Sequence, residues 1–251
     1  MNNNSNGYIL RYAAIMVIIA AALLSSAAML LKPFQEKNMA IEKMGGILEA
    51  AGIKDIPTDE MIKAFNEYVK EEIVINQDGK VVDVYDKPEG KEKAKAFNIN
   101  LKEQYFNKSQ GKPYELPLYV LDKNGETIYI IPLLGTGLWG PIWGNIALKD
   151  DLNTVEGVYF DHKGETPGLG AEITTEAFRK QFVGKKIFDD KGNFTSILVV
   201  KGGVKTLPPN MQEHGVDAIS GGTITSNGVN DMLKNVLESY LPYFNELRKN
   251  K

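Results

Sequence analysis

The strongest constraint on this chain lies near its N-terminus, where residues 12–31 contain no charged side chain and are mostly Ile, Ala, Leu, Val and Met. A helix needs about 20 apolar residues to cross the hydrocarbon core of a bilayer, and this run has that length. Tyr8 and Tyr12 can occupy the headgroup region at one end. Pro33 follows Lys32 at the other end and is expected to end the helix. The pattern predicts a single transmembrane helix.

A cleaved secretory signal peptide is the competing interpretation of this run. Its apolar region would be shorter and followed by a small-residue cleavage site, whereas Ala27 and Ala28 are followed by more apolar residues through Leu31. An uncleaved anchor is therefore favoured. The basic residues leave the orientation open, because Arg11 precedes the run and three lysines follow it closely.

Composition argues against several classes of site. The 251 residues include no cysteine, which excludes disulfides, thiolate catalysis and cysteine-ligated iron–sulfur clusters. The two histidines, His162 and His214, are too few for a histidine-rich metal site and are expected at the surface. The acidic pairs ending at Asp151 and Asp190 are interpreted as turns, so no metal site is predicted. A formal charge of −3 gives no indication of a nucleic-acid partner.

Apolar spacing in the rest of the chain predicts strand pairs mixed with helices, which is typical of an α+β fold. Thr58 is expected to cap one helix, and either Thr174 or Thr175 another. Residues 87–112 are rich in charge and are interpreted as a solvated surface segment without an assigned function. Helices are expected over residues 39–51, 61–68, 175–182 and 227–241. Strands are expected over residues 73–75, 81–84, 116–121, 127–133, 146–149, 155–160 and 194–201.

Residues 217–226 lead into the last predicted helix and could carry chemistry. Ser226 or Thr225 is expected as its N-cap, and Gly221 and Gly222 permit a close approach of the backbone. The free N–H groups at a helix start form a natural place for a phosphate. An ordinary glycine turn with a helix cap explains the same residues. The segment is not a P-loop, because no Gly-Lys-[Ser/Thr] follows at the required spacing.

Two earlier loops are also unusual. In residues 164–170, Pro167 fixes one φ angle while Gly168 and Gly170 allow positive φ, so the loop could present backbone groups to a planar ligand. A tight strand-to-helix connection is the alternative. Residues 135–144 hold both tryptophans among glycines. They could cover an aromatic ligand, fill the core or form a protein contact.

Together and in this order, the three segments resemble the FMN-binding domains of bacterial respiratory redox proteins, most nearly the family of the C subunit of the sodium-translocating NADH:quinone oxidoreductases. The resemblance is carried by the N-terminal anchor, Gly-Leu-Trp at 137–139, Glu-Thr-Pro-Gly-Leu-Gly at 165–170, and residues 217–226. It implies five regions. They are residues 1–11, an N-terminal tail; 12–31, the transmembrane helix; 32–134, a membrane-proximal α+β region; 135–245, the FMN-binding domain; and 246–251, a C-terminal tail.

In that family a flavin transferase attaches FMN through a phosphodiester to the last Thr of an Asp-x-x-Ser-Gly-Ala-Thr motif. The matching residues here are Asp217, Ser220, Gly221, Gly222 and Thr223. The resemblance thus implies covalent FMN on Thr223, with Gly222 in place of the family's alanine and Thr225 as the competing acceptor. Further residues expected to contact the FMN are Leu138, Trp139, Glu165, Thr166, Gly168, Leu169, Gly170 and Thr225.

The resemblance further implies that the chain carries electrons within a complex of six subunits in the bacterial inner membrane. That complex oxidises NADH, reduces quinone and exports sodium, and the soluble domain of this chain lies on the periplasmic side. The NADH site is expected on a partner protein, since this chain has no dinucleotide fingerprint. One alternative is the related G subunit of the ferredoxin-linked Rnf complex, although the longer N-terminal region favours the quinone reductase. The other is a membrane-anchored binding module without a cofactor.

Overall fold

The computed structural model describes residues 6–249 and divides the chain into two units, Met1–Lys43 and Met44–Lys251. Helix α1 (Asn6–Ala50) provides the described part of the first unit up to Lys43. Its last turns, from Met44 to Ala50, belong to the second unit. Among the described residues, α1 is the one helix long and apolar enough to cross a membrane, judged by length and composition. A long apolar N-terminal helix followed by a mixed α+β unit confirms the predicted fold class.

Helix α1 does not end at Pro33 as expected, because it runs through the proline to Ala50. A proline inside a helix removes one hydrogen bond and costs about 3 kcal/mol. The turns beyond it are held by burial of Met44 and Ile47 in the second unit, where both are 0% exposed. The helix ends at Ala50. Gly52 follows in the closing turn with φ +78°, and the N–H of Ile53 donates to the carbonyl of Leu48 at 3.0 Å.

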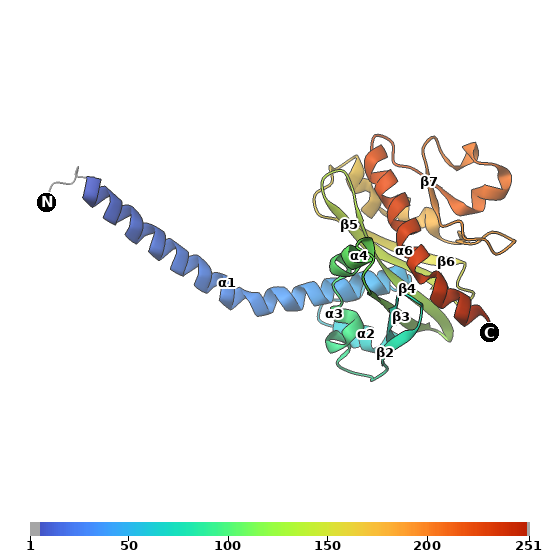
Figure 1. The fold of residues 1–251 in the computed structure, drawn as a ribbon, viewed down its shortest axis with the longest axis horizontal. Coiled ribbons are helices and arrows are strands. Elements are labelled where there is room, and N and C mark those ends of the chain that lie inside the picture. Colours follow the sequence, from blue (N-terminus) through green and yellow to red (C-terminus); the bar gives the residue numbers. More distant parts are fainter. Residues whose placement is uncertain (1–5, 250–251) are drawn as a thin grey trace. The chain divides into compact units, whose positions relative to one another are not determined.

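The second unit is built on a six-stranded antiparallel sheet with the strand order β2-β1-β3-β4-β5-β6 (Figure 1). The strands are β1 (Val69–Asn76), β2 (Val81–Tyr85), β3 (Glu115–Lys123), β4 (Glu126–Thr136), β5 (Pro141–Lys149) and β6 (Val155–His162). Both predicted hairpins are confirmed as β1–β2 and β3–β4. Their turns contain Asp78-Gly79 and Asn124-Gly125, dipeptides that favour tight hairpin turns.

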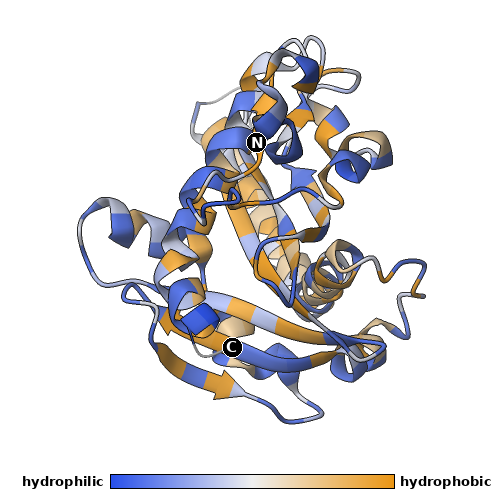
Figure 2. Cartoon of the chain, turned by 90° about the vertical axis from the view of Figure 1, so that its right-hand side faces the viewer, coloured by the Kyte–Doolittle hydropathy of each residue, from blue (hydrophilic) through white to orange (hydrophobic). Residues whose placement is uncertain are grey.

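Besides the last turns of α1, the α-helices of the second unit are α2 (Met61–Tyr68), α3 (Lys95–Asn98), α4 (Leu101–Ser109), α5 (Glu176–Arg179) and α6 (Thr223–Lys249). Helix α6 crosses the sheet and packs on β4 (Figure 1). Its buried side chains recur at helical spacing, at Val229, Met232, Leu233, Val236, Leu237 and Tyr240. They meet the apolar stretches of the strands, which Figure 2 shows in orange. The prediction for residues 227–241 was therefore correct in type but too short at both ends.

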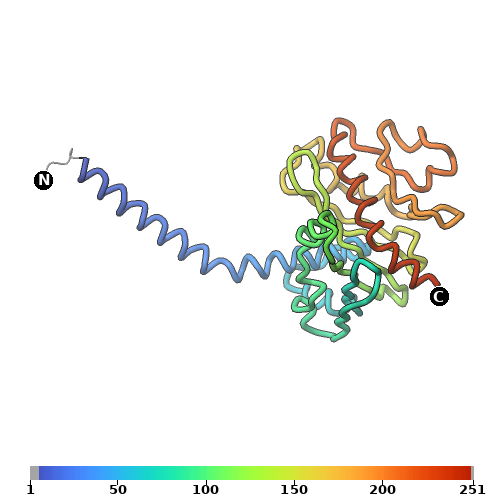
Figure 3. Tube along the Cα trace, in the orientation of Figure 1, coloured from blue at the N-terminus to red at the C-terminus, as the bar shows by residue number. Residues whose placement is uncertain are grey.

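A long irregular segment connects β6 to α6 (Figure 3). It contains the short parallel pair β7 (Leu198–Val200) and β8 (Gly215–Asp217). The predicted strand over residues 194–201 was too long, and β8 was not predicted. Thr175 caps α5 by accepting the N–H of Phe178 at 3.4 Å, in agreement with the expected helix start.

Two expectations about local structure were wrong. Helix α2 begins after Glu60 without a side-chain cap, so Thr58 does not cap it. Residues 87–112 are not a plain solvated segment, because they contain α3 and α4 and bury Lys91 to 2% exposure. The ammonium group of Lys91 donates to the carbonyl of Asn66 at 2.7 Å, and burial lowers its pKa. A lysine can be buried in this way when its stem packs on apolar groups and its charged end finds an acceptor.

The five-region division stays a prediction. Strand β4 runs across the expected boundary at residue 135, and strands from both sides of that residue join one sheet. Helix α6 extends into the expected C-terminal tail as far as Lys249. Residues 1–5 of the expected N-terminal tail and residues 250–251 lie outside the described part of the chain.

Candidate functional site

The three segments singled out in the sequence meet at the carboxylate of Glu165, which follows β6 and is 5% exposed. Its Oε1 accepts the backbone N–H of Trp139 at 2.8 Å. Its Oε2 accepts the hydroxyl of Thr225 at 2.5 Å. One buried side chain thus joins the β4–β5 turn, the loop after β6 and the first turn of α6.

Two glycines make room for this carboxylate. A Cβ placed on Gly137 would collide with Oε1, and a Cβ on Gly170 would collide with Oε2 and with the hydroxyl of Thr225. Gly170 does not adopt the positive φ that a glycine allows, and this glycine provides space instead. Gly168 does have φ +76°, and its N–H donates to Oε1 of Glu172 at 3.0 Å.

The loop expected over residues 135–144 is shorter than predicted. Strand β4 continues to Thr136 and β5 begins at Pro141, so residues 137–140 form a hairpin turn closed by the N–H of Gly137 and the carbonyl of Gly140 at 2.8 Å. Trp143 therefore lies in β5, apart from Trp139. The turn presents Leu138 and Trp139 with 49% and 66% of their surfaces exposed.

Helix α6 starts at Thr223, before both expected caps, Thr225 and Ser226. The carbonyl of Gly222 accepts the N–H of Ser226 at 2.9 Å, which places Thr225 and Ser226 inside the first turn. Because both residues lie within the helix, neither serves as the N-cap, and both are buried. The hydroxyl of Ser226 instead accepts the N–H of Ile219 at 3.0 Å and holds the preceding turn against the helix.

These segments enclose a pocket of about 230 Å³. Its lining residues are Leu138, Glu165, Thr166, Leu169, Gly170, Gly221, Gly222, Thr223, Ile224 and Thr225. Nine of these ten are expected site residues, and Ile224 was missed. The helical spacing of buried residues in α6 continues from Val229 back to Thr225. This spacing predicts that the neighbouring Ile224 points away from the core, and Ile224 is 57% exposed.

Four expected site residues do not line this pocket: Trp139, Gly168, Asp217 and Ser220. Oδ1 of Asp217 accepts the N–H of Val204 at 2.6 Å, and its own N–H donates to the side chain of Gln181 at 2.8 Å. Asp217 therefore holds the chain that leads into the site. Ser220 is exposed in the turn before α6.

The two histidines differ in exposure. His214 is 0% exposed, and its Nδ1 lies 2.6 Å from the carbonyl oxygen of Lys186, so the prediction for this residue was wrong. His162 is half-buried, and its Nδ1 accepts the N–H of Glu165 at 3.1 Å. Asp151 and Asp189 lie in turns, and each accepts backbone N–H groups there. No cluster of metal-ligating side chains occurs within the described residues.

The start of helix α6 favours an anion beside Thr223. The first N–H groups of an α-helix have no partner inside the helix, and the helix dipole places positive charge at that end. Thr223 is the first residue of the 27-residue helix α6, and its side chain is partly exposed at the pocket. The apolar side chains of Leu138, Leu169 and Ile224 stand around it. The site therefore offers a hydroxyl, an anion-binding helix end and surfaces suited to a planar ring.

Comparison with known proteins agrees with this geometry. Residues 137–238 match the FMN-binding domain family. The chain is 35% identical to the C subunit of the Na(+)-translocating NADH-quinone reductase of Neisseria meningitidis serogroup B over 226 residues, covering 87% of this chain and 85% of the relative. It is 37% identical to the C subunit of the same reductase from Vibrio vulnificus strain YJ016 over 205 residues, covering 79% and 78%.

Two crystal structures share the fold. The C subunit of the Na(+)-translocating NADH-quinone reductase from Parabacteroides distasonis superposes with a TM-score of 0.73 at 36% identity, covering 85% of this chain and 96% of that one. NqrC from Shewanella oneidensis superposes with a TM-score of 0.68 at 28% identity, covering 84% and 99%.

The fold and the pocket define an FMN-binding domain that follows an apolar N-terminal helix of membrane-spanning length. Within that class, the likeness to the relatives extends through most of the chain and into the region before the FMN-binding domain. The chain belongs to the family of the C subunit of the Na⁺-translocating NADH-quinone reductase.

Proposed function

We propose that this chain carries electrons as the C subunit of a sodium-translocating NADH:quinone oxidoreductase, with FMN attached covalently to Thr223. The observation that supports Thr223 over Thr225 is the difference in exposure and hydrogen bonding between their two side chains. Thr225 is 2% exposed, and its hydroxyl donates to Glu165. Thr223 is partly exposed at the start of α6, where helix N–H groups attract a phosphate.

Attachment needs a flavin nucleotide activated at its phosphate and a flavin transferase. The O–H bond of Thr223 breaks and its proton passes to a base of the transferase, while a bond forms between Oγ and the FMN phosphorus. The bond from that phosphorus to the leaving group breaks, and the leaving group departs with the bonding electron pair. No electron is transferred in this step. The chain contributes the oriented hydroxyl and the positive end of α6 beside it.

The residues present fit FMN in a partly open site. Pockets that enclose a small ligand usually have volumes of about 300–1,000 Å³, whereas this pocket has about 230 Å³. The ring would therefore stay partly outside, against the exposed side chains of Leu138, Leu169 and Ile224. FMN supplies the redox chemistry, and the protein holds and orients it. An open ring edge suits exchange of electrons with partner proteins.

We place the second unit on the periplasmic side of a bacterial inner membrane, with the other five subunits of the complex as partners. The NADH and quinone sites belong to those partners in this proposal. The lack of cysteine makes the orientation easy to measure. A single Lys112→Cys chain in intact cells should react with a membrane-impermeant maleimide after the outer membrane is permeabilised. Labelling that requires lysis of the inner membrane would place the unit in the cytoplasm.

The attachment is tested with the full chain co-expressed with its flavin transferase. Intact mass and in-gel flavin fluorescence should show one FMN adduct, lost in Thr223→Val. Thr225→Ser, which retains the hydroxyl bonded to Glu165, is the matched control and should keep the adduct. A flavinylated Thr223→Val chain with the adduct mapped to Thr225 would contradict the assignment, as would an unmodified native chain.

A further inference from the structure

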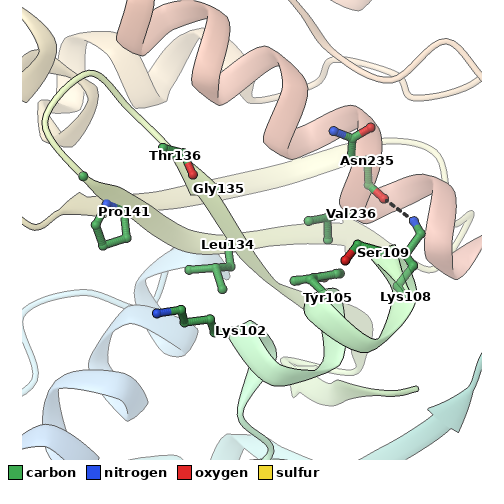
Figure 4. Close-up of a pocket in the computed structure, with 11 residues that line it drawn as sticks. Lys102, Tyr105, Lys108, Ser109, Leu134, Gly135, Thr136, Pro141, Asn235 and Val236 are labelled. Atoms are coloured by element: carbon green, nitrogen blue, oxygen red, sulfur yellow. Dashed lines mark hydrogen bonds between the residues drawn. The ribbon is translucent and has the colours of Figure 1, made fainter. Parts of the chain in front are cut away.

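A second and larger cavity lies between α4, the β4–β5 hairpin and α6 (Figure 4). Its volume is about 700 Å³, within the range of pockets that bind small molecules. None of its lining residues lines the pocket at Thr223. Yet the two are neighbours, because Thr136 directly precedes the hairpin turn that carries Leu138 and Gly140 is the last residue of that turn.

The cavity combines apolar surface with positive charge. Leu134, Pro141, Val236 and the ring of Tyr105 supply apolar surface. Two lysines, Lys102 and Lys108, line it, and no Asp or Glu does. The cavity is therefore cationic although the whole chain has a formal charge of −3.

The two lysines extend from opposite ends of α4 and have different roles (Figure 4). The ammonium group of Lys108 donates to the hydroxyl of Ser239 at 2.6 Å and to the carbonyl of Asn235 at 3.3 Å, so it holds α4 against α6. Lys102 is exposed, and its ammonium group has no hydrogen-bond or ion-pair partner among residues 6–249. An unpaired cation beside a large apolar cavity is suited to a ligand with one anionic group.

We propose that this cavity binds an amphipathic anion, an apolar body carrying one carboxylate or phosphate group. The apolar body packs between Leu134, Tyr105 and Val236, and the anionic group pairs with Lys102. A charge-assisted hydrogen bond at the edge of an apolar cavity is stronger than one in open water. The ligand chemistry has two sources, a free carboxylic acid or an anionic phospholipid.

The test uses the full flavinylated chain in nanodiscs of neutral phosphatidylcholine, with 4-(4-fluorophenyl)butanoate as the probe. Its ¹⁹F signal should broaden saturably with the protein but not with empty discs. The corresponding neutral amide should bind about tenfold more weakly, because it loses the charge-assisted contact. Equal binding of acid and amide, or no binding beyond that of empty discs, would overturn the proposal.

Two variants locate the site. Lys102→Gln should weaken acid binding about tenfold and leave amide binding unchanged. Lys112→Gln is the matched control, since Lys112 is also exposed, lies just beyond α4 and does not line the cavity. An equal effect of both variants would contradict the site. Neither lysine touches the pocket at Thr223, so flavinylation should persist in both.

The lipid composition of the discs then identifies the source. If the probe binds the native chain more weakly in phosphatidylglycerol discs than in phosphatidylcholine discs, and Lys102→Gln abolishes this difference between the discs, a phospholipid occupant is supported. Equal binding in both kinds of disc supports a free acid. Probe binding that falls in phosphatidylglycerol equally for native chain and Lys102→Gln would be bulk repulsion and would argue against a lipid at Lys102.

Discussion

The hydroxyl of Thr225 donates to the carboxylate of Glu165 across 60 residues of sequence, and both side chains are buried. This bond fixes the first turn of α6 against the loop after β6. It also occupies the hydroxyl that would compete with Thr223 for FMN. The structural role of Thr225 and the proposed modification of Thr223 are therefore two consequences of one arrangement.

Glu165→Ala should destabilise the second unit by about 3 kcal/mol, because two hydrogen bonds to a buried charged group are lost and their donors are left unpaired. Glu165→Gln keeps the shape and one acceptor oxygen, so its effect should be smaller. The measurement is denaturant unfolding of the full chain followed by tryptophan fluorescence. FMN incorporation should fall in the same order. A fully stable Glu165→Ala chain would contradict this role.

Gly170→Ala should also destabilise the site, by about 1–3 kcal/mol as for other overpacking substitutions. Its new methyl group would meet both Oε2 of Glu165 and the side chain of Thr225. Gly164→Ala, six residues earlier in the same loop, is the control because nothing lies within 4 Å of its Cβ position. The denaturant midpoint of Gly170→Ala should be lower than that of Gly164→Ala. Equal midpoints would contradict crowding at Gly170.

The parts of the fold that the sequence predicted depend on local chemistry. Asp78-Gly79 and Asn124-Gly125 specify hairpin turns by themselves, and the helical spacing from Val229 to Tyr240 specifies the buried face of α6. The uncharged run at residues 12–31 likewise predicted the apolar helix from composition alone.

The errors arose where distant residues decide the outcome. His214 is buried because its ring meets the carbonyl of Lys186, and no pattern near His214 indicates this contact. Gly137 and Gly170 look like turn glycines in the sequence, although their actual function is to admit Glu165. The grouping of the three site segments was inferred from the family resemblance, and the carboxylate that joins them became visible only in three dimensions.

Asp151 should make the protein sensitive to acid. Burial raises its pKa, but hydrogen bonds from Thr154 and Asn153 together with the nearby Arg248 outweigh burial and lower the pKa below the usual 3.8. Because the folded pKa is below the unfolded one, Asp151 stabilises the fold above its unfolded pKa. That contribution is lost as the pH falls through the folded pKa.

Asp151→Asn should therefore be less stable than the native chain near neutral pH, and the difference should shrink as the pH falls from about 5 through the folded pKa, which lies below 3.8. Asp59→Asn is the control, since Asp59 is exposed and its carboxylate accepts no hydrogen bond in the described part of the chain. Its stability should follow that of the native chain at each pH. A constant gap between Asp151→Asn and the native chain would exclude the titration of Asp151 as the cause.

Gly222 is the position where this chain departs from the motif of the family it resembles, and Gly222→Ala restores the family's alanine. A Cβ there would lie 3.0 Å from Cγ2 of Ile219 and 3.3 Å from the backbone carbon of Leu169, so these neighbours must shift slightly. Alanine is also a poor residue immediately before a helix, although it lowers the entropy of the unfolded chain. The balance predicts a loss of about 0.5–1 kcal/mol with FMN attachment retained.

Gly221→Ala is the contrasting variant. Gly221 has φ +75°, and a Cβ at this position would press on the side chain of Leu169 at the pocket wall. The left-handed conformation alone costs a residue with a Cβ about 1–2 kcal/mol. Gly221→Ala should therefore lose more stability than Gly222→Ala and take up less FMN, as measured by denaturant unfolding and in-gel flavin fluorescence. If Gly222→Ala instead lost the FMN adduct and Gly221→Ala kept it, the flavin transferase would be reading the residue before Thr223 and not the shape of the turn.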